Sequence, residues 1–215
     1  MNKKSLTETD IRTKFITPAL VQAGWDIHKQ VREEFSFTKG RIIVRGKLHT
    51  RGESRRADFI LYHKPNLPLA IIECKAGHHR LEEALAQLDG YQRSFAAQFV
   101  FNQVCVGLNR RQGLYGAILT KPAFYARYRL EAPELAEVAA RLGSEPGEQE
   151  QLLWALFEPG RFLELVAHFV LFETRDGKTV KKLPRYQQWR AVRKTVRRLT
   201  SGANDEPTLT SRCTW

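Results

Sequence analysis

The amino-acid sequence predicts an α/β protein, in which a mixed sheet flanked by helices is followed by a mostly helical region. Three observations lead to this prediction. Short apolar runs suited to buried strands occur at 57–62, 69–74 and 99–106. A helical stripe of apolar residues begins at Leu81, between the second and third of these runs. Beyond residue 125 the periodicity is mainly helical.

The N-terminal segment 5–24 has the periodicity of a helix. Ser5 and Glu8 fit a capping box, because they are a serine and a glutamate three positions apart at the start of the segment. Pro18 has no N–H for the preceding turn and should kink this helix or end its regular part. Gly24 should end it.

A strand should follow at 30–37, because polar and apolar residues roughly alternate there, and a second strand is expected at 42–48, after a turn marked by Gly40. The polar and basic stretch 48–56 is expected to be a loop. The stretch 63–68 contains two prolines and an asparagine, and it should be the turn that makes the apolar strands on either side hairpin neighbours.

The later elements follow from the same patterns. A strand at 114–119 is expected to pair beside the one at 99–106, and Asp-Gly marks a turn at 175–178. Helices are expected at 133–142, 148–157, 161–171 and 186–199. The last helix has an apolar face made of Trp189, Val192, Val196 and Leu199.

The charge balance indicates a polyanionic partner. The chain has 35 Lys and Arg against 23 Asp and Glu, a formal net charge of +12, and phosphates attract such a surface over a long range. A protein that is merely basic remains the alternative. The three cysteines form no C-x-x-C pair, so neither a zinc site nor a disulfide framework is indicated. Without a signal peptide or a membrane-length apolar stretch, we expect a cytoplasmic protein.

The chemically informative segment carries two acids and a lysine. Asp58 interrupts one apolar strand, Glu73 ends the next, and Lys75 follows two positions later, on the same side as Glu73. Two carboxylates held close together repel unless a cation lies between them, and Mg²⁺ prefers such oxygen ligands. This pattern predicts a site for metal-dependent phosphodiester hydrolysis. Lys75 would either position the attacking water or stabilise the developing charge, and spacing alone leaves both roles open.

This arrangement resembles the PD-(D/E)xK nuclease signature, with Asp58, Glu73 and Lys75 as the matching residues. Ala57 stands where the signature has proline. The plain alternative is a salt-bridged acid and lysine at strand ends.

Two neighbouring features strengthen the resemblance. Gln87 and Tyr91 form Q-x-x-x-Y on the following helix and share one face, and many DNA-processing members carry such a motif to support the site and touch DNA. Tyr91 is equally suited to the core. Glu8 matches an acid that in this family adds to the metal shell, although the capping box explains it as well.

Basic residues precede Asp58 in the sequence. A loop rich in arginine beside two carboxylates suits contacts to the DNA backbone, although such runs are more often solvated surface. The candidate DNA-binding residues are Arg45, Lys47, Arg51, Arg55 and Arg56.

The chain as a whole resembles the N-terminal part of the restriction (motor, R) subunit of type I restriction-modification enzymes. The stretches that carry the resemblance include TETDIRTKFITPALVQAGWDI, RADFILYHKPNLPLAIIECK, FEPGRFLELVAHFVLFE and KKLPRYQQWRAVRKTV. The resemblance implies an Mg²⁺-dependent endonuclease domain ahead of an ATP-driven DNA translocase, with double-stranded DNA and the specificity and methylase subunits as partners. By the same match, Tyr186 and Gln188 would contact the adenine of ATP.

The resemblance also divides the chain. We expect a nuclease domain at 1–125, a helical linker at 126–200 that leads toward a helicase motor, and a disordered tail at 201–215. The phosphate loop G-x-x-x-x-G-K-[ST] of the motor is absent, so we expect a chain truncated before the translocase, with ATP bound only in a full-length subunit. Two rival functions are a stand-alone DNA repair or recombination nuclease and an inactive DNA-binding or interaction fragment.

Overall fold

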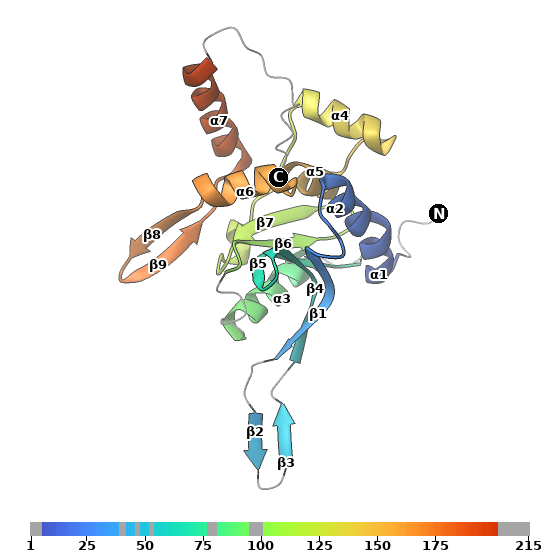
Figure 1. The fold of residues 1–215 in the computed structure, drawn as a ribbon, viewed down its shortest axis with the longest axis vertical. Coiled ribbons are helices and arrows are strands. Elements are labelled where there is room, and N and C mark those ends of the chain that lie inside the picture. Colours follow the sequence, from blue (N-terminus) through green and yellow to red (C-terminus); the bar gives the residue numbers. More distant parts are fainter. Residues whose placement is uncertain are drawn as a thin grey trace.

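The computed structural model describes residues 6–38, 42–45, 48–51, 54–76, 81–94 and 101–201 (Figure 1). Its elements are α1 (Glu8–Ile11), η1 (Arg12–Ile16), α2 (Thr17–Ala23), β1 (Val31–Thr38), β2 (Ile42–Arg45), β3 (Leu48–Arg51), β4 (Ser54–Lys64), β5 (Leu67–Cys74), α3 (Leu81–Ser94), β6 (Val104–Leu108), β7 (Gly113–Ala117), η3 (Pro122–Phe124), α4 (Ala132–Leu142), α5 (Glu148–Leu156), α6 (Pro159–His168), β8 (Leu171–Arg175), β9 (Lys178–Lys182) and α7 (Tyr186–Ser201).

The centre of the molecule is a five-stranded sheet with the order β1-β4-β5-β6-β7. Strands β5 and β6 are parallel, and the other neighbours are antiparallel. Helix α3 lies in the connection between the two parallel strands, as a parallel pair requires a crossover. The predicted α/β fold, a mixed sheet flanked by helices, is confirmed.

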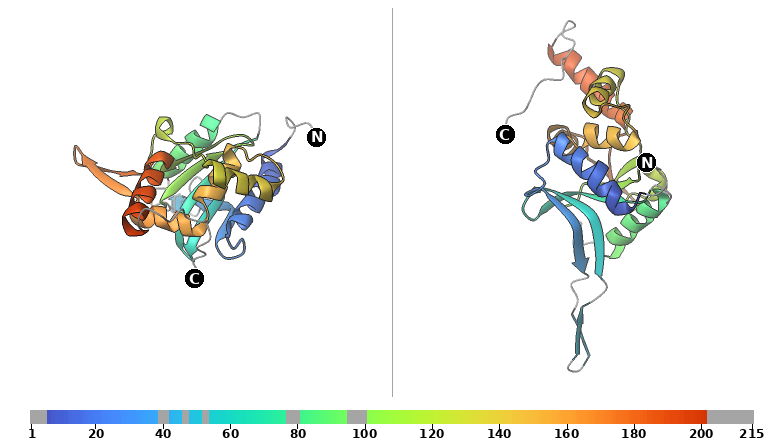
Figure 2. Two further views of the ribbon diagram at one scale, coloured as in Figure 1. Left: turned by 90° about the horizontal axis from the view of Figure 1, so that it is seen from above. Right: turned by 90° about the vertical axis from the view of Figure 1, so that its right-hand side faces the viewer.

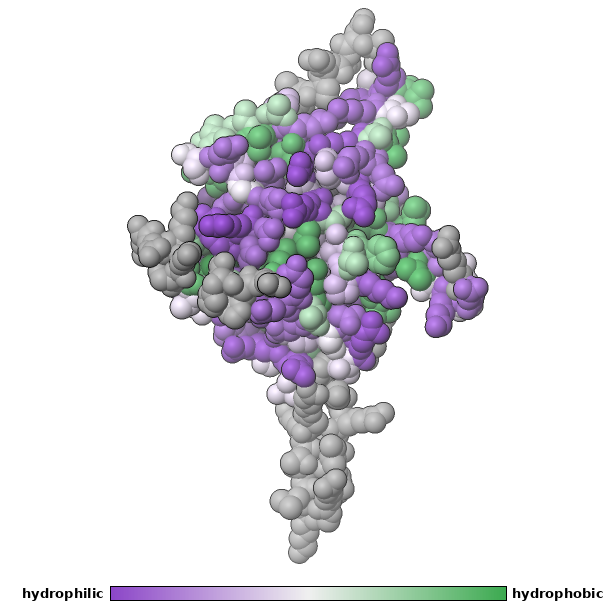
Figure 3. Space-filling view, turned by 180° about the vertical axis from the view of Figure 1, so that it is seen from behind, coloured by the Kyte–Doolittle hydropathy of each residue, from purple (hydrophilic) through white to green (hydrophobic). Residues whose placement is uncertain are grey.

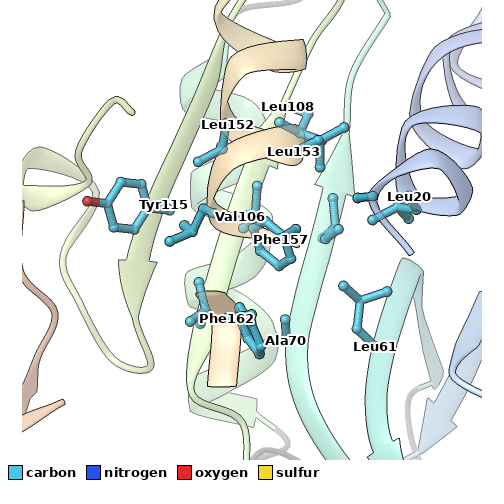
Figure 4. Packing of buried hydrophobic residues seen from close by; sticks show 14 of the residues in the cluster. Leu20, Leu61, Ala70, Val106, Leu108, Tyr115, Leu152, Leu153, Phe157 and Phe162 are labelled. Carbon is cyan, nitrogen blue, oxygen red and sulfur yellow. The ribbon is translucent and has the colours of Figure 1, made fainter. Parts of the chain in front are cut away.

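Both faces of the sheet are covered by helices (Figures 1 and 2). Helix α3 packs on one face, where Leu85 and Leu88 join Ile71 in one buried cluster. Segments α1–α2 and α5–α6 cover the other face. Figure 4 shows residues of α5 stacked over the sheet, with Leu153 close to Leu108. The predicted helical stripe that begins at Leu81 is therefore the core-facing side of α3.

The start of the first helix differs from the prediction. Its N-cap is Thr7, whose hydroxyl accepts a hydrogen bond from the Asp10 backbone N–H at 3.1 Å. The Asp10 carboxylate accepts in return from the backbone N–H of Thr7. The predicted box of Ser5 and Glu8 is wrong, because the helix begins at Glu8 and the shorter Asp10 closes the box. Ser5 itself lies outside the described residues.

The helix is interrupted ahead of Pro18 and stops at Gly24, as predicted. The helical ladder widens into the π-helical turn η1 just before Pro18, which occupies the first turn of α2. A π-type turn accommodates a proline that has no N–H to donate. Gly24 ends the helix with φ 111°, a conformation that favours glycine.

Three predicted boundaries are corrected. The predicted strand 42–48 and part of the predicted loop 48–56 form a hairpin of β2 and β3, in which Ile42 is paired with Arg51. The third apolar strand begins at Val104. The helix predicted to reach residue 171 ends at His168, because the chain enters the hairpin β8–β9. The Asp-Gly turn of that hairpin is confirmed, with both residues at positive φ.

The buried core continues past the predicted boundary between residues 125 and 126. Leu152, Leu153 and Phe162 belong to the same buried cluster as the sheet residues Ala70 and Val106. The predicted linker region thus supplies one layer of the core. The predicted tail lies outside the described residues from 202 onward.

Hairpin β8–β9 is held on the sheet by polar contacts. The Lys181 Nζ donates to Gln103 Oε1 at 2.7 Å, and Tyr115 donates its hydroxyl hydrogen to the Pro184 carbonyl at 2.8 Å.

Seen from behind, the surface is mainly hydrophilic with smaller apolar areas (Figure 3). No helix in the described ranges is long and apolar enough to cross a bilayer.

Candidate functional site

The site forms where strands β4 and β5 meet the start of the N-terminal helix. The two strands are antiparallel, and Phe59 is paired with Ile72. Asp58 and Glu73 are the next residues beyond that pair, so the register brings the two carboxylates to adjacent strands at the same level. The hairpin neighbourhood expected for these strands is therefore present.

Asp58 is held at both carboxylate oxygens. Its Oδ2 accepts a hydrogen bond from the Cys74 backbone N–H at 2.7 Å. Its Oδ1 lies 3.4 Å from the Arg12 Nη1. Burial raises the pKa of Asp58 above its ordinary value, although the Cys74 amide and the charge of Arg12 act in the opposite direction. The carboxylate is thus fixed in place but only partly compensated.

Glu73 is the more deeply buried acid, with 2% of its surface exposed. Burial, together with the nearby charge of Asp58, raises its pKa to about 8. Its Oε2 is buried and has no hydrogen-bond partner among the residues that the structure describes. An orphaned carboxylate oxygen beside a second carboxylate is a position where a cation would be stabilised.

Lys75 lies between two acids of the site. Its Nζ is 3.5 Å from Glu73 Oε1 and 3.6 Å from Glu8 Oε1. The Lys75 side chain is mostly buried, whereas that of Glu8 is 41% exposed. Since Glu8 takes no part in the capping box, its observed partner is Lys75. The structure therefore brings together all four residues predicted for the catalytic and metal-binding roles.

Gln87 and Tyr91 lie on α3 and reach the strand that carries Asp58. Tyr91 donates its hydroxyl hydrogen to the Arg56 carbonyl at 2.7 Å and accepts a hydrogen bond from the Gln87 amide. Burial, and the negative charge of Glu73, raise the pKa of Tyr91. Its ring also packs edge-on against Phe37, at 5.2 Å between centroids. Tyr91 is thus both a core residue and a support for the backbone two positions before Asp58.

Two residues of the site were missed by the sequence analysis. Arg12 is buried beside Asp58, and its Nη2 donates to Glu34 Oε1 at 2.8 Å. Glu34 has φ 50°, which is uncommon for a residue other than glycine. Arg12 follows Glu8 by four positions, which places both on one helix face and was an available signal. Nothing in the local sequence marks Glu34.

The predicted DNA-binding residues are placed in part. Arg55 and Arg56 are exposed on β4, and the Arg56 guanidinium lies 3.6 Å from Glu34 Oε2. Arg45 is the last residue of β2 and Arg51 is the last residue of β3. Lys47 lies outside the described residues. Hairpin β2–β3 extends from the end of the sheet in Figure 1.

The residues predicted to contact ATP lie at the start of α7. The Tyr186 ring is 6.0 Å from the Tyr128 ring, and Arg190 stacks over Tyr186 at 4.8 Å. Gln188 accepts a hydrogen bond from the Arg185 backbone N–H at 2.8 Å. These contacts support the start of the helix, and they are separate from those of the two-carboxylate site.

The donor set fits a hard divalent cation. Within the described ranges, three or more His, Cys, Asp or Glu side chains nowhere gather in an arrangement that would itself enclose a metal ion. Asp58 and Glu73 offer two carboxylates, and one oxygen of Glu73 has no hydrogen-bond partner among the described residues. Mg²⁺ is typically bound by one or two protein carboxylates and completes its shell with water and phosphate oxygens.

Comparisons with known proteins converge on one family. Residues 44–124 match the family model described as "Type I restriction enzyme R protein N terminus". The chain is 32% identical over 206 residues to the type I restriction enzyme EcoAI endonuclease subunit of Escherichia coli, which is 95% of this chain and 23% of that protein. The type I restriction enzyme HindI endonuclease subunit of Haemophilus influenzae is 29% identical over 156 residues, or 70% of this chain and 14% of that protein.

A solved fragment described as an HsdR subunit of a type I restriction enzyme from Vibrio vulnificus YJ016 aligns with a TM-score of 0.43 and 21% identity. That alignment covers 92% of this chain and 33% of the solved one. The chain thus spans a quarter or less of the length of the curated relatives named above.

Proposed function

This chain is homologous to the N-terminal region of type I restriction enzyme R subunits, and we propose that it carries the DNA-cleaving centre of such an enzyme. The proposed reaction is Mg²⁺-dependent hydrolysis of DNA phosphodiesters in defence against foreign DNA. The observation that carries the proposal is the convergence of Asp58, Glu73 and Lys75 from adjacent strand segments, with a carboxylate oxygen among them that has no partner in the described part of the chain. In this proposal the sheet and helix α3 form a PD-(D/E)xK restriction-endonuclease-like core.

Asp58 and Glu73 are the proposed metal ligands, with Glu8 as an additional oxygen donor at the exposed side. A divalent metal bound there would supply charge stabilisation and a bound water of lowered pKa. The hydrogen bond from the Cys74 amide fixes Asp58 before any ligand arrives, so little reorganisation is needed.

Lys75 is the proposed cationic residue at the scissile phosphate. In the reaction, a water oxygen forms a bond to phosphorus, the bridging P–O bond breaks, and the leaving oxygen takes up a proton. The ammonium group of Lys75 is held by Glu73 and Glu8 at the edge of the site. From there it is suited to orient the water or to stabilise charge on the phosphoryl oxygens.

Double-stranded DNA is the proposed substrate, with Arg55 and Arg56 as backbone contacts beside the site. We further propose that the specificity and methylase subunits of a type I complex are the protein partners. ATP would serve a full-length subunit. These proposals rest on the family relationship and the formal net charge of +12.

Plasmid nicking in the presence of Mg²⁺ tests the proposed function. We expect Asp58→Ala and Lys75→Ala to reduce nicking by about 100-fold or more, as for the loss of a group that stabilises a transition state. Lys29→Ala is the matched control, because Lys29 is an exposed lysine paired with Asp26. Nicking that stays equal in all four proteins would rule out this centre as the source of activity.

A further inference from the structure

Arg12 is a buried cation of the site that has no role in the proposed reaction. Only 9% of its side chain is exposed. Its guanidinium contacts Asp58 Oδ1 at 3.4 Å through Nη1, and Glu34 Oε1 at 2.8 Å through Nη2. Because burying a charge is costly unless it is paired, these two carboxylates account for its position.

Lys75 and Arg12 contact different acids of the site. Lys75 contacts Glu73 and Glu8, whereas Arg12 contacts Asp58 and Glu34. The Oδ2 of Asp58 is fixed by a backbone amide, so Arg12 is the side chain that fixes the other oxygen. Arg12 is therefore placed to orient Asp58 together with the Cys74 amide.

Glu34 holds the guanidinium of Arg12 by a hydrogen bond. The β1–β4 register pairs Glu33 with Phe59 and Phe35 with Ala57, so Glu34 lies across from Asp58. It has φ 50° within a strand, where most side chains avoid that conformation. Its carboxylate makes the shorter of the two contacts to Arg12, and the Arg12 hydrogen bond lowers the pKa of Glu34. Glu34 thus stays ionised and holds the guanidinium.

We propose that Arg12 is a positioning residue: held by Glu34, it fixes Asp58 Oδ1 and thereby sets the affinity of the site for a divalent metal. The inference rests on the proposed function, because it assigns a role at the same metal site. Arg12 touches neither the metal nor the substrate in this scheme. It acts through its ion pair with Asp58, in the way that outer-shell partners commonly orient a metal ligand.

Calorimetric titration with Mg²⁺ alone, without DNA, tests the inference. Arg12→Met keeps the apolar stem and removes the guanidinium, and we expect it to weaken Mg²⁺ binding by about 10-fold or more. Arg12→Lys retains the charge and should recover part of the affinity. Glu34→Gln should weaken binding in the wild-type background and have no further effect in the Arg12→Met background, because Glu34 acts through Arg12.

Two controls separate positioning from folding. Arg127→Met removes an arginine that pairs with Glu148 at 3.0 Å elsewhere in the molecule, and it should leave Mg²⁺ affinity unchanged. Thermal melting without metal identifies variants that have lost their structure. If Arg12→Met does not fold, Glu34→Gln provides the test, because the Glu34 side chain is 46% exposed. The Mg²⁺ affinity of the Glu34→Gln protein must then still be lower than that of the wild type.

The possible outcomes distinguish the two proposals. Wild-type Mg²⁺ binding that Asp58→Asn abolishes, together with unchanged or tighter binding in folded Arg12→Met, would overturn the role of Arg12 alone. If the wild-type protein shows no Asp58-dependent binding, the metal site itself is refuted, and Arg12 is then only an ion-pair residue of the fold.

Discussion

Glu73 and Asp58 are two carboxylates at one site with different surroundings. Asp58 receives a backbone hydrogen bond and an arginine contact. Glu73 has a buried Oε2 with no partner within the described part of the chain, and its remaining oxygen is 3.5 Å from Lys75. This difference explains why burial raises the pKa of Glu73 to about 8, and it makes Glu73 the residue through which pH should act most strongly.

The raised pKa of Glu73 predicts how the stability of the metal-free protein depends on pH. The folded state holds the proton more tightly than the unfolded chain, whose pKa is near 4.5. The stabilising contribution of the protonated form is therefore complete below about pH 4.5 and is lost as the pH rises to about 8. Glu73→Gln mimics the protonated side chain, so above pH 8 it should be more stable than the wild type by a few kcal/mol.

Urea unfolding at pH 5 and pH 9 in the presence of a chelator measures this effect. Glu137→Gln, at an exposed glutamate that pairs with Arg141 on α4, is the control and should follow the wild type at both values. Parallel pH profiles for the wild type and Glu73→Gln would mean that Glu73 is ionised without cost in the folded protein.

Helix α3, which carries Gln87 and Tyr91, packs closely on strand β6 of the sheet. Gly107 on β6 is paired with Glu73 on β5. A Cβ added at Gly107 would lie 2.7 Å from Leu85 Cδ2, with the helix residues Leu81 and Ala84 both at 3.5 Å. The absence of a side chain at Gly107 therefore allows α3 to lie close to the strands of the site.

Two glycine substitutions test this packing with opposite expected signs. Gly107→Ala should lower the free energy of unfolding by about 1–3 kcal/mol, because the Leu85 side chain must shift within a packed core. Gly90→Ala is the matched control inside α3, where a Cβ would meet no described atom within 4 Å. It should raise stability by up to about 1 kcal/mol, since alanine favours the helix. Chemical denaturation measures both, and a neutral Gly107→Ala would show that α3 can move away freely.

The elements that the sequence predicted well are those whose burial is uniform. Strand β5 is buried along most of its length, and the apolar stripe of α3 faces the sheet, so a run and a period were sufficient signals. The hairpin β8–β9 escaped prediction because Leu171, Phe172 and Val180 are all exposed. Apolar residues that face solvent on both strands do not produce the burial pattern by which a strand is recognised in a sequence.

The residues of the candidate site also differ in whether the sequence alone could predict their grouping. Asp58, Glu73 and Lys75 could be grouped from sequence because one hairpin turn joins their strands. The Arg12–Glu34 pair depends on the β1–β4 register and on one residue with positive φ, neither of which local sequence specifies. Long-range pairing of this kind requires the folded structure.

The molecule as a whole is tied together by contacts between distant segments. The Trp25 indole N–H donates to the Phe157 carbonyl, linking the end of the N-terminal helix to the end of α5. Trp189 on α7 is 2% exposed, and its ring lies 6.0 Å from those of Tyr128 and Phe169. The sequence placed Trp189 on an apolar face, but only its own position on that face is buried.

The remaining positions of that face indicate how α7 is attached. Val192, Val196 and Leu199 are exposed by 47%, 52% and 81%. Helix α7 is therefore anchored at its first turns and extends from the body of the molecule (Figures 1 and 2). Ion pairs of Arg190 with Glu134 and of Lys194 with Glu131 support it. The exposed pair of Lys194 contributes little to stability.

This attachment predicts unequal effects of two alanine substitutions on one helix. Trp189→Ala should lower the free energy of unfolding by about 3–5 kcal/mol, because it leaves a large cavity between Tyr128 and Phe169. Val196→Ala should change it by less than about 0.5 kcal/mol, since the side chain is half exposed. Denaturant unfolding gives both values, and limited proteolysis should cut α7 early only in Trp189→Ala. Equal losses in the two variants would mean that the outer half of α7 is packed as tightly as its anchored end, which contradicts the exposure of Val192 and Leu199.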